Sequence, residues 1–160
     1  ALRIITPEFE GLTFVRDVGS QGLQRTARVK LSTTDRPVPL NSLGDGVVRI
    51  LQLVLKLFPA KGGFFLIDEF ENGLHFSVQE KIWELLLTMA EKLDIQVFAT
   101  THSWDCIESF ARAAHANQAA EGVLFRVGQS VRTSDHGRII ATVFDEEQLY
   151  SITQTDVEVR

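Results

Sequence analysis

Two carboxylates that directly follow an apolar run are the first candidates for chemistry in this sequence. Phe64 to Ile67 are apolar without interruption, and Asp68 and Glu69 come next. Such a run favours a strand covered on both faces, as in a parallel sheet, and open α/β sheets bind ligands beyond the carboxyl ends of their strands. There Asp68 would bind Mg²⁺, and Glu69 would orient or deprotonate an attacking water. The alternative is a buried strand that merely ends in polar residues.

A histidine is expected at the same edge of the sheet. A helix from about Ser77 to Lys92 is predicted to follow, then a β-rich run over 95–99, and then His102. Strand, helix and strand at this spacing predict a βαβ unit with parallel strands and a right-handed crossover. His102 would then lie beside the two carboxylates and could donate a hydrogen bond to a phosphate oxygen. A lone histidine at a helix start is otherwise a cap or packing residue, and three polar neighbours could cap the helix or contact water: Thr100, Thr101 and Ser103.

A glycine-containing loop precedes the first predicted helix. The loop reads Ser42-Leu43-Gly44-Asp45-Gly46, and Ser42 and Asp45 have the spacing of a capping box. The helix has an apolar face at helical periodicity and ends before Pro59; this face comprises Val47, Ile50, Leu51, Val54, Leu55 and Phe58. A helix N-terminus with free N–H groups binds anions, and glycines permit close approach of a ligand. The alternative is a plain cap with two glycines in a tight turn.

The remaining segments are predicted to form structural elements that carry no candidate chemistry. Residues 1–40 are β-rich, with strands near 12–15 and 25–31, a turn at 19–22, and a start at 1–5 that has the pattern of mid-strand residues. Further on we expect a helix over 104–117, a strand over 122–127, a hairpin of 131–133 with 138–144, and a short helix capped by Asp145. The basic side chains of the first 40 residues are best explained as a solvated strand face; they are Arg25, Arg28, Lys30 and Arg36.

Composition narrows the class of protein. The chain has 160 residues, of which 44% are hydrophobic and 23% charged, so one globular domain is the default. The net charge of −5 argues against a general nucleic-acid-binding surface. Cys106 is the only cysteine, which excludes an internal disulfide and fits a cytoplasmic location; we expect it buried on a helix. No apolar run approaches the roughly 20 residues of a membrane span.

Three segments together, 42–46, 64–75 and 98–103, carry a family resemblance. In order and spacing they resemble the second half of an ATP-binding-cassette-type ATPase domain. The resemblance is closest to the AAA-15/AAA-21-type ATPases related to the overcoming-lysogenization-defect family, and it covers most of residues 37–160. It implies an α/β P-loop NTPase fold, with a mostly parallel sheet flanked by helices and additional antiparallel strands. It also implies ATP and Mg²⁺ as cofactors.

The resemblance also implies roles for individual residues. Asp68 and Glu69 correspond to the Walker B pair and His102 to the switch histidine, while residues 72–75 cover the D-loop at a dimer interface. Glu71 has no firm counterpart and is expected on the surface. The signature loop, which faces the nucleotide bound by the other subunit, corresponds to Ser42, Gly44, Asp45 and Gly46. The sequence Ser-Leu-Gly-Asp-Gly departs from the transporter-type Ser-Gly-Gly-Gln, so transporter behaviour does not carry over.

One expected motif is missing from the chain. A Walker A loop needs Gly-Lys, and no glycine here is followed by lysine. Residues 1–160 are therefore expected to form one partial ATPase domain, a C-terminal piece comprising a β-rich segment (1–40), the motif-bearing core (41–127) and a hairpin with tail (128–160). The family's Walker A strand would lie between the strands near 95–99 and 123–127, and its absence would expose their edges and apolar faces.

Partners follow from that absence. We expect the chain to need its N-terminal Walker A half, or to dimerise, and the complete protein to form a homodimer through the signature loop and D-loop. A nucleic acid or a partner nuclease is compatible with the family. The alternative function is a non-enzymatic interaction module on an ATPase-like fold. A metal-dependent nuclease is disfavoured, because two carboxylates and one histidine are too few for a two-metal site.

Overall fold

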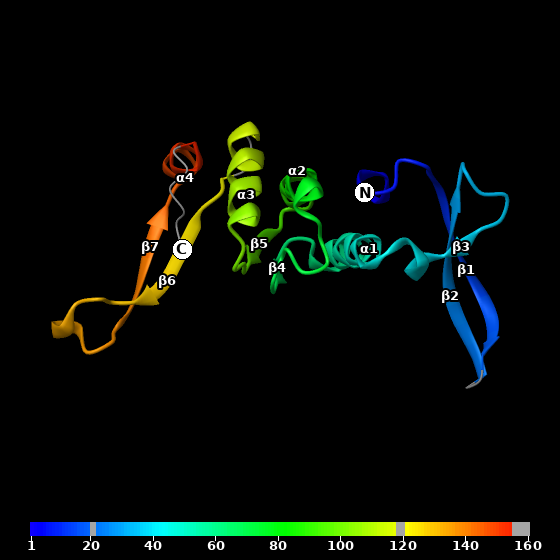
Figure 1. The fold of residues 1–160 in the computed structure, drawn as a ribbon, viewed down its shortest axis with the longest axis horizontal. Coiled ribbons are helices and arrows are strands. Elements are labelled where there is room, and N and C mark those ends of the chain that lie inside the picture. The colour runs from blue at the N-terminus through cyan, green and yellow to red at the C-terminus, as the bar shows by residue number, and fades with distance from the viewer. Residues whose placement is uncertain (20–21, 118–120, 155–160) are drawn as a thin grey trace.

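The elements follow one another in an elongated row (Figure 1). The computed structural model describes residues 1–19, 22–117 and 121–154. A three-stranded antiparallel sheet lies at one end; it contains β1 (Phe9–Gly19), β2 (Gly22–Leu31) and β3 (Val38–Pro39). The central region contains α1 (Asp45–Leu57), β4 (Phe64–Ile67), α2 (Phe76–Leu93), β5 (Gln96–Ala99) and α3 (Trp104–Ala116). The far end contains β6 (Leu124–Gln129), β7 (Ile139–Phe144) and α4 (Glu146–Thr153).

The predicted βαβ unit is confirmed in the middle of the row. β4 pairs in parallel with β5, from Phe64 opposite Gln96 to Ile67 opposite Ala99, and α2 makes the crossover between them. The mixed α/β class is also confirmed. The described strands divide into three small sheets, and this pair is their parallel part.

The hydrophobic core lies between this sheet, α1 and α2. Phe65 and Ile67 of β4 are buried in it together with apolar residues of both helices. Phe70, just after β4, is fully buried, and its ring stacks on Trp83 of α2 with the centroids 3.8 Å apart. The core therefore fixes the segment after β4, where the candidate chemistry lies, against the crossover helix.

The opposite face of β4 differs from the expectation that both faces are covered. Phe64 and Leu66 alternate with the buried residues and are 66% and 73% exposed. On β5, Phe98 is 48% exposed, and its ring lies 6.1 Å from that of Phe64. The prediction of a strand covered on both faces is wrong for this chain, because no described element packs over these three side chains.

The buried face of α1 is rotated from the predicted one towards its C-terminal end. Val47 and Ile50 are buried as expected, but Leu53 and Leu57 complete the stripe. Leu55 and Phe58 were expected inside and are 55% and 57% exposed. Apolar residues outnumber the core positions along this helix, so periodicity alone could not select the stripe. The helix ends before Pro59, as predicted, and a 3₁₀ turn follows.

The N-terminal segments were predicted in part. The strands of the first hairpin pair as expected, and residues 20–21 of the predicted turn lie outside the described residues. Residues 1–5 were expected to have strand character, but Leu2–Ile4 form a 3₁₀ helix in which the Ile4 N–H donates to the Ala1 carbonyl. Leu2 is buried in the core, so this segment is held by packing and local hydrogen bonds.

The C-terminal hairpin uses a different strand from the predicted one. β7 pairs with β6, from Leu124 opposite Phe144 to Gln129 opposite Ile139, so the pairing of 131–133 with 138–144 is wrong. Residues 133–135 form a 3₁₀ turn instead, followed by His136 in the left-handed conformation. The Asp145 cap of α4 is confirmed, whereas residues 155–160 of the predicted tail lie outside the described part. Across the described ranges, no helix combines the length and apolar character that a membrane crossing requires.

Candidate functional site

The candidate residues meet at the carboxyl edge of the β4–β5 pair. Beyond the paired strands, the Thr100 N–H donates to the Ile67 carbonyl at 2.9 Å, and the Phe70 N–H donates to the Thr100 carbonyl at 2.9 Å. These bonds hold the segment after β4 against the segment after β5. Asp68, Glu69 and His102 are all exposed there. The structure thus brings together the two carboxylates and the histidine-bearing segment, as the βαβ unit predicted.

Thr100 ties the two acidic residues together. Its hydroxyl donates to Asp68 Oδ1 at 2.6 Å and accepts from the Glu69 N–H at 2.9 Å. The first bond fixes the Asp68 carboxylate and leaves its second oxygen available to a ligand. The sequence suggested Thr100 only as a polar neighbour. The strand register could have predicted this contact. Thr100 is the first residue after β5 and stands opposite Asp68, the first residue after β4.

Arg49 supports the same turn from α1, and sequence analysis missed it. Its Nη2 donates to the carbonyl oxygens of Asp68 at 3.0 Å and Glu69 at 3.2 Å. Glu69 has a φ of +47°, in a left-handed region that costs a non-glycine residue about 1–2 kcal/mol. The arginine and the threonine together stabilise this turn. They also join the helix that begins at the glycine loop to the two acidic residues.

Glu71 holds the histidine segment, so its assignment to the free surface is wrong. Its Oε1 accepts from the His102 N–H at 2.9 Å, and its Oε2 is buried. Burial acts to raise the pKa of Glu71, but hydrogen bonds from the His102 and Glu71 N–H groups outweigh it, helped by the nearby Thr101 hydroxyl and the His102 charge. The net result is a pKa below the ordinary value of 4.5, so the carboxylate stays ionised at neutral pH.

The glycine loop forms the entry to α1, although not through the predicted capping box. Ser42 lies in a 3₁₀ turn (Leu40–Leu43), and its hydroxyl donates to the Pro39 carbonyl at 2.6 Å. Gly44 is the N-cap residue, with φ 91° and ψ 163°, a conformation essentially restricted to glycine. No side chain caps the first turn of α1, and Ser42 and Asp45 are exposed. The anion-binding character predicted for this loop is therefore compatible with its geometry.

The glycine loop also packs on the segment after β4. A methyl group placed on Gly46 would lie 3.0 Å from the Gly73 carbonyl oxygen and 3.2 Å from Ile5 Cδ1. Gly46 is thus required by close packing. Nearby, the His75 ring accepts from the Ser77 N–H and is the N-cap of α2. The two segments that the family resemblance assigns to a dimer interface are therefore neighbours within one chain.

The donors at this edge fit Mg²⁺ only in a limited way. Asp68 offers one carboxylate, and Mg²⁺ commonly binds proteins through one or two carboxylates plus waters and substrate phosphates. In the described part of the chain, no cluster of three or more His, Cys, Asp and Glu side chains has the arrangement of a metal site. The site thus fits a metal that also binds phosphate oxygens.

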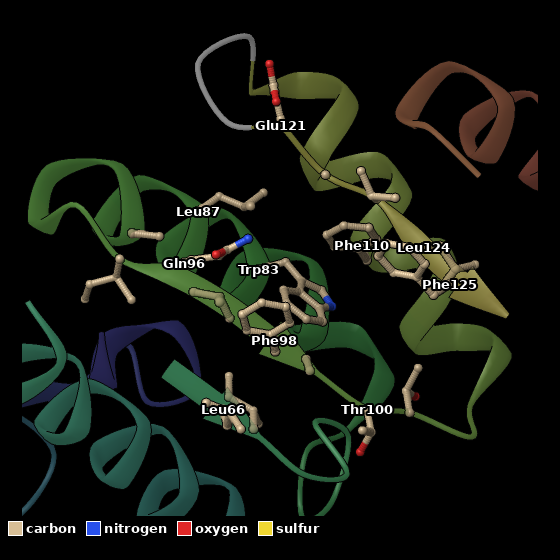
Figure 2. Close-up of a pocket in the computed structure, with 18 of the residues that line it drawn as sticks. Leu66, Trp83, Leu87, Gln96, Phe98, Thr100, Phe110, Glu121, Leu124 and Phe125 are labelled. Carbon is tan, nitrogen blue, oxygen red and sulfur yellow. The ribbon is translucent and has the colours of Figure 1, made fainter. Parts of the chain in front are cut away.

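An apolar groove runs from this edge along β5 to β6 (Figure 2). Its volume is about 1160 Å³. Figure 2 shows Leu66 and Phe98 on one side and Phe110, Leu124 and Phe125 on the other, and Thr100 lies near one end of the groove. Trp83 lines the floor, and its buried Nε1 has no hydrogen-bond partner within the usual distance in the described structure. The groove therefore connects an exposed apolar surface to the candidate site.

Cys106, on the wall of the groove, is a structural residue. It is buried in α3, as predicted, and burial raises the pKa of its thiol to about 11. The thiol is therefore protonated at neutral pH, which makes it a poor nucleophile.

Comparisons with known proteins agree with this architecture. A family model, AAA_21, described as "AAA domain, putative AbiEii toxin, Type IV TA system", matches residues 13–105, more than half of the chain. An "ATP/GTP phosphatase" of Helicobacter pylori (strain ATCC 700392 / 26695) is 33% identical over 84 residues. That match covers 51% of this chain but only 23% of the relative's own length.

A solved structure shows a similar fold. It is described as "Structural biochemistry of ATP-driven dimerization and DNA stimulated activation of SMC ATPases" and matches with a TM-score of 0.59 and 13% identity, covering 99% of this chain and 87% of that one. At this identity the similarity shows the fold alone. With the family match, the assignment is clear: the chain belongs to the AAA_21 family of AAA-domain proteins and has the fold of a P-loop ATPase.

Proposed function

We propose that the chain is the catalytic C-terminal half of a Mg²⁺-dependent ATPase that needs a Walker A half for phosphate binding. The observation that carries this proposal is the joint placement of Asp68, Glu69, Thr100 and the His102 segment at one sheet edge, at the end of an apolar groove. Family membership supports ATP hydrolysis in general.

Each side chain at the edge then has a defined role. Bound Mg²⁺ would supply charge neutralisation of the phosphates. Asp68, held by Thr100, would offer its second oxygen to the metal. Glu69 is exposed and unshielded, so it can orient a water and accept its proton. His102, whose main chain is held at this edge by Glu71, would donate from its ring to the terminal phosphate.

The groove has the properties expected for a missing strand. Its volume exceeds the roughly 300–1,000 Å³ of typical small-molecule pockets, which favours a polypeptide segment. Within the described chain, β5 pairs only with β4 and β6 only with β7, so each leaves an edge open. A strand placed beside β5 and parallel to it would end at the edge that holds Asp68 and Thr100. The loop after that strand would then reach the candidate site, which is where a Walker A loop is needed.

Covering the apolar face would also stabilise the assembly. Phe64, Leu66 and Phe98 are each about half to three-quarters exposed, and full burial of such a side chain is worth about 1.5–3 kcal/mol. The N-terminal half is the occupant that fits both the open edges and this face.

The signature loop supports a dimer as the active form. Ser42, Gly44, Asp45 and Gly46 stand at an exposed helix N-terminus, where N–H groups and the helix dipole favour a phosphate of the partner subunit's nucleotide. The similar SMC ATPase is described as dimerising in an ATP-driven way. We extend that behaviour to this chain as part of the proposal.

The test is reconstitution of the two halves. The chain is titrated with its N-terminal half, and ATP binding is measured by calorimetry with Mg²⁺ for each half and for the pair. In a Trp104→Phe variant, Trp83 is the remaining tryptophan, and its fluorescence reports directly on the groove. The proposal is supported if the pair binds and hydrolyses ATP and neither half does so by itself. Failure of the pair to bind ATP would refute it.

A non-enzymatic interaction module is the second candidate, and the exposed groove favours it. In that case the groove binds a protein segment, while the acidic edge binds no nucleotide. Stable capture of the N-terminal half with a shift of Trp83 emission, but without ATP binding, would select this alternative.

A further inference from the structure

We propose that Glu71 is a positioning residue for catalysis, which sets the His102 segment against the acidic turn. This inference rests on the proposed ATPase function. Glu71 lies on the segment after β4 and His102 on the segment after β5, so the bond between them crosses the edge where the candidate chemistry occurs. None of the roles suggested by the family resemblance included Glu71.

The geometry shows why a carboxylate is needed at this position. Glu71 Oε1 accepts from the main-chain N–H of His102 at 2.9 Å, so it fixes the backbone from which the imidazole projects. The Thr101 hydroxyl accepts from the Ser103 N–H at 3.1 Å, and Ser103 caps α3. The bond to Glu71 thus links the residues just before α3 to the segment after β4, two residues beyond the Thr100 bonds to Asp68 and Glu69.

The surroundings keep the carboxylate in one place. Leu74, three residues later, is buried, and the Leu74 N–H donates to the Glu71 carbonyl at 2.8 Å. Oε2 is buried and has no hydrogen-bond partner within the usual distance among the described residues, and the Thr101 hydroxyl and Cys106 thiol lie nearby. A half-buried ionised group that is fixed at both its main chain and its side chain is suited to hold the His102 segment in one position.

The role differs from that of Asp68 and Glu69. Those carboxylates face solvent and the incoming phosphate, whereas Glu71 acts through His102 and contacts no reacting atom. Its loss should lower turnover without weakening nucleotide binding to the same extent, because the histidine contributes once the terminal phosphate is in place. A glutamine at the same position should retain much of the effect, since its amide oxygen can accept the same N–H.

The experiment compares E71A, E71Q, H102A and the double variant E71A/H102A in the reconstituted pair, with Glu80→Ala as a matched control. Glu80 also accepts a hydrogen bond, from Arg112 Nε, but on the outer surface of α2 and α3. We expect E71A to lower kcat about tenfold with KM for ATP changed less than about threefold, the size of one lost hydrogen bond to a charged group. E71Q should recover most of kcat, and Glu80→Ala should match wild type.

The double variant separates positioning from a general effect on folding. If Glu71 acts through His102, E71A/H102A should be no slower than H102A alone. Multiplying effects, or an E71A enzyme as fast as wild type beside an impaired H102A enzyme, would overturn the proposal.

Hydrogen exchange gives a readout independent of ATP turnover. In the 160-residue chain, E71A should speed exchange in a peptide that contains the His102 amide, while E71Q and Glu80→Ala leave it unchanged. Unchanged exchange in E71A would overturn the proposal. If the reconstituted pair failed to bind ATP, the proposed function would fail, and the exchange result would still decide the position of Glu71 by itself.

Discussion

The carboxyl edge of β4 and β5 and the groove beside β5 involve the same two strands. They differ in how far the chain's own residues hold or cover them. At the edge, Thr100, Arg49 and Glu71 hold the acidic turn and the histidine segment with bonds of 2.6–3.2 Å. In the groove, Leu66 is largely exposed and Phe98 is half-exposed. The difference teaches that the polar site is assembled by hydrogen bonds within the chain, whereas no described element covers the apolar face.

The largest expected effect concerns the edge. Glu69→Gln in the reconstituted pair should lower ATP turnover about 100-fold or more, because the variant lacks a group to accept the proton of the attacking water. ATP binding should remain, and a nucleotide-bound dimer should accumulate. Phosphate release, equilibrium binding and sedimentation measure these outcomes.

The control for this variant is Glu84→Gln, an exposed position on α2. It should behave as wild type. Turnover that is unchanged in Glu69→Gln would show that another group accepts the proton of the attacking water, and Glu69 would lose its proposed role.

A substitution in the groove should weaken binding of the partner half more than it lowers the stability of the chain itself. Phe98→Glu places a charge on a half-exposed strand position that lines the groove, so it should weaken binding of the N-terminal half about tenfold or more. Leu55→Glu, at a similarly exposed position on α1, is the control, because Leu55 does not line the groove. Equal affinities of the two variants, measured through Trp83 fluorescence, would argue against the groove as the binding surface.

A smaller effect is expected at the contact of the glycine loop with the edge. Gly46→Ala should destabilise the chain by about 1–3 kcal/mol, because the new methyl group meets the Gly73 carbonyl and the Ile5 side chain. Gly128→Ala in β6 adds a methyl group with no atom within 4 Å and should be close to neutral. Urea unfolding of both variants measures the difference, and similar midpoints would show that the loop moves aside at little cost.

The smallest expected effect is on the stability of the chain at acidic pH. The pKa of folded Glu71 is lowered, so its ionised form contributes stability that is present above the ordinary value of 4.5 and is lost as the pH falls through the lowered value. Between about pH 5 and pH 3, the urea midpoint of wild type should therefore fall more steeply than that of Glu71→Gln. Parallel curves would mean that the carboxylate gains nothing from its bond to the His102 N–H.

Local sequence patterns predicted most helices and strands, but not which of their faces are buried. The apolar run at 64–67, the βαβ spacing and the Asp145 cap each depend on neighbours in sequence, and each appears in the structure. The stripe of α1 did not follow from periodicity, because Leu53 and Leu57, rather than Leu55 and Phe58, meet the core. β7 was predicted to pair with residues 131–133, but it pairs with β6 instead.

The sequence by itself determined which residues stand at the carboxyl edge, because strand and helix lengths place Asp68, Glu69 and the His102 segment at one end of a parallel pair. Only the tertiary structure decided which side chains hold them there. Thr100, Arg49 and Glu71 come from three different segments, and their bonds depend on distances between elements that no local spacing encodes. The same holds for the groove, since exposure of an apolar strand depends on which elements pack over it.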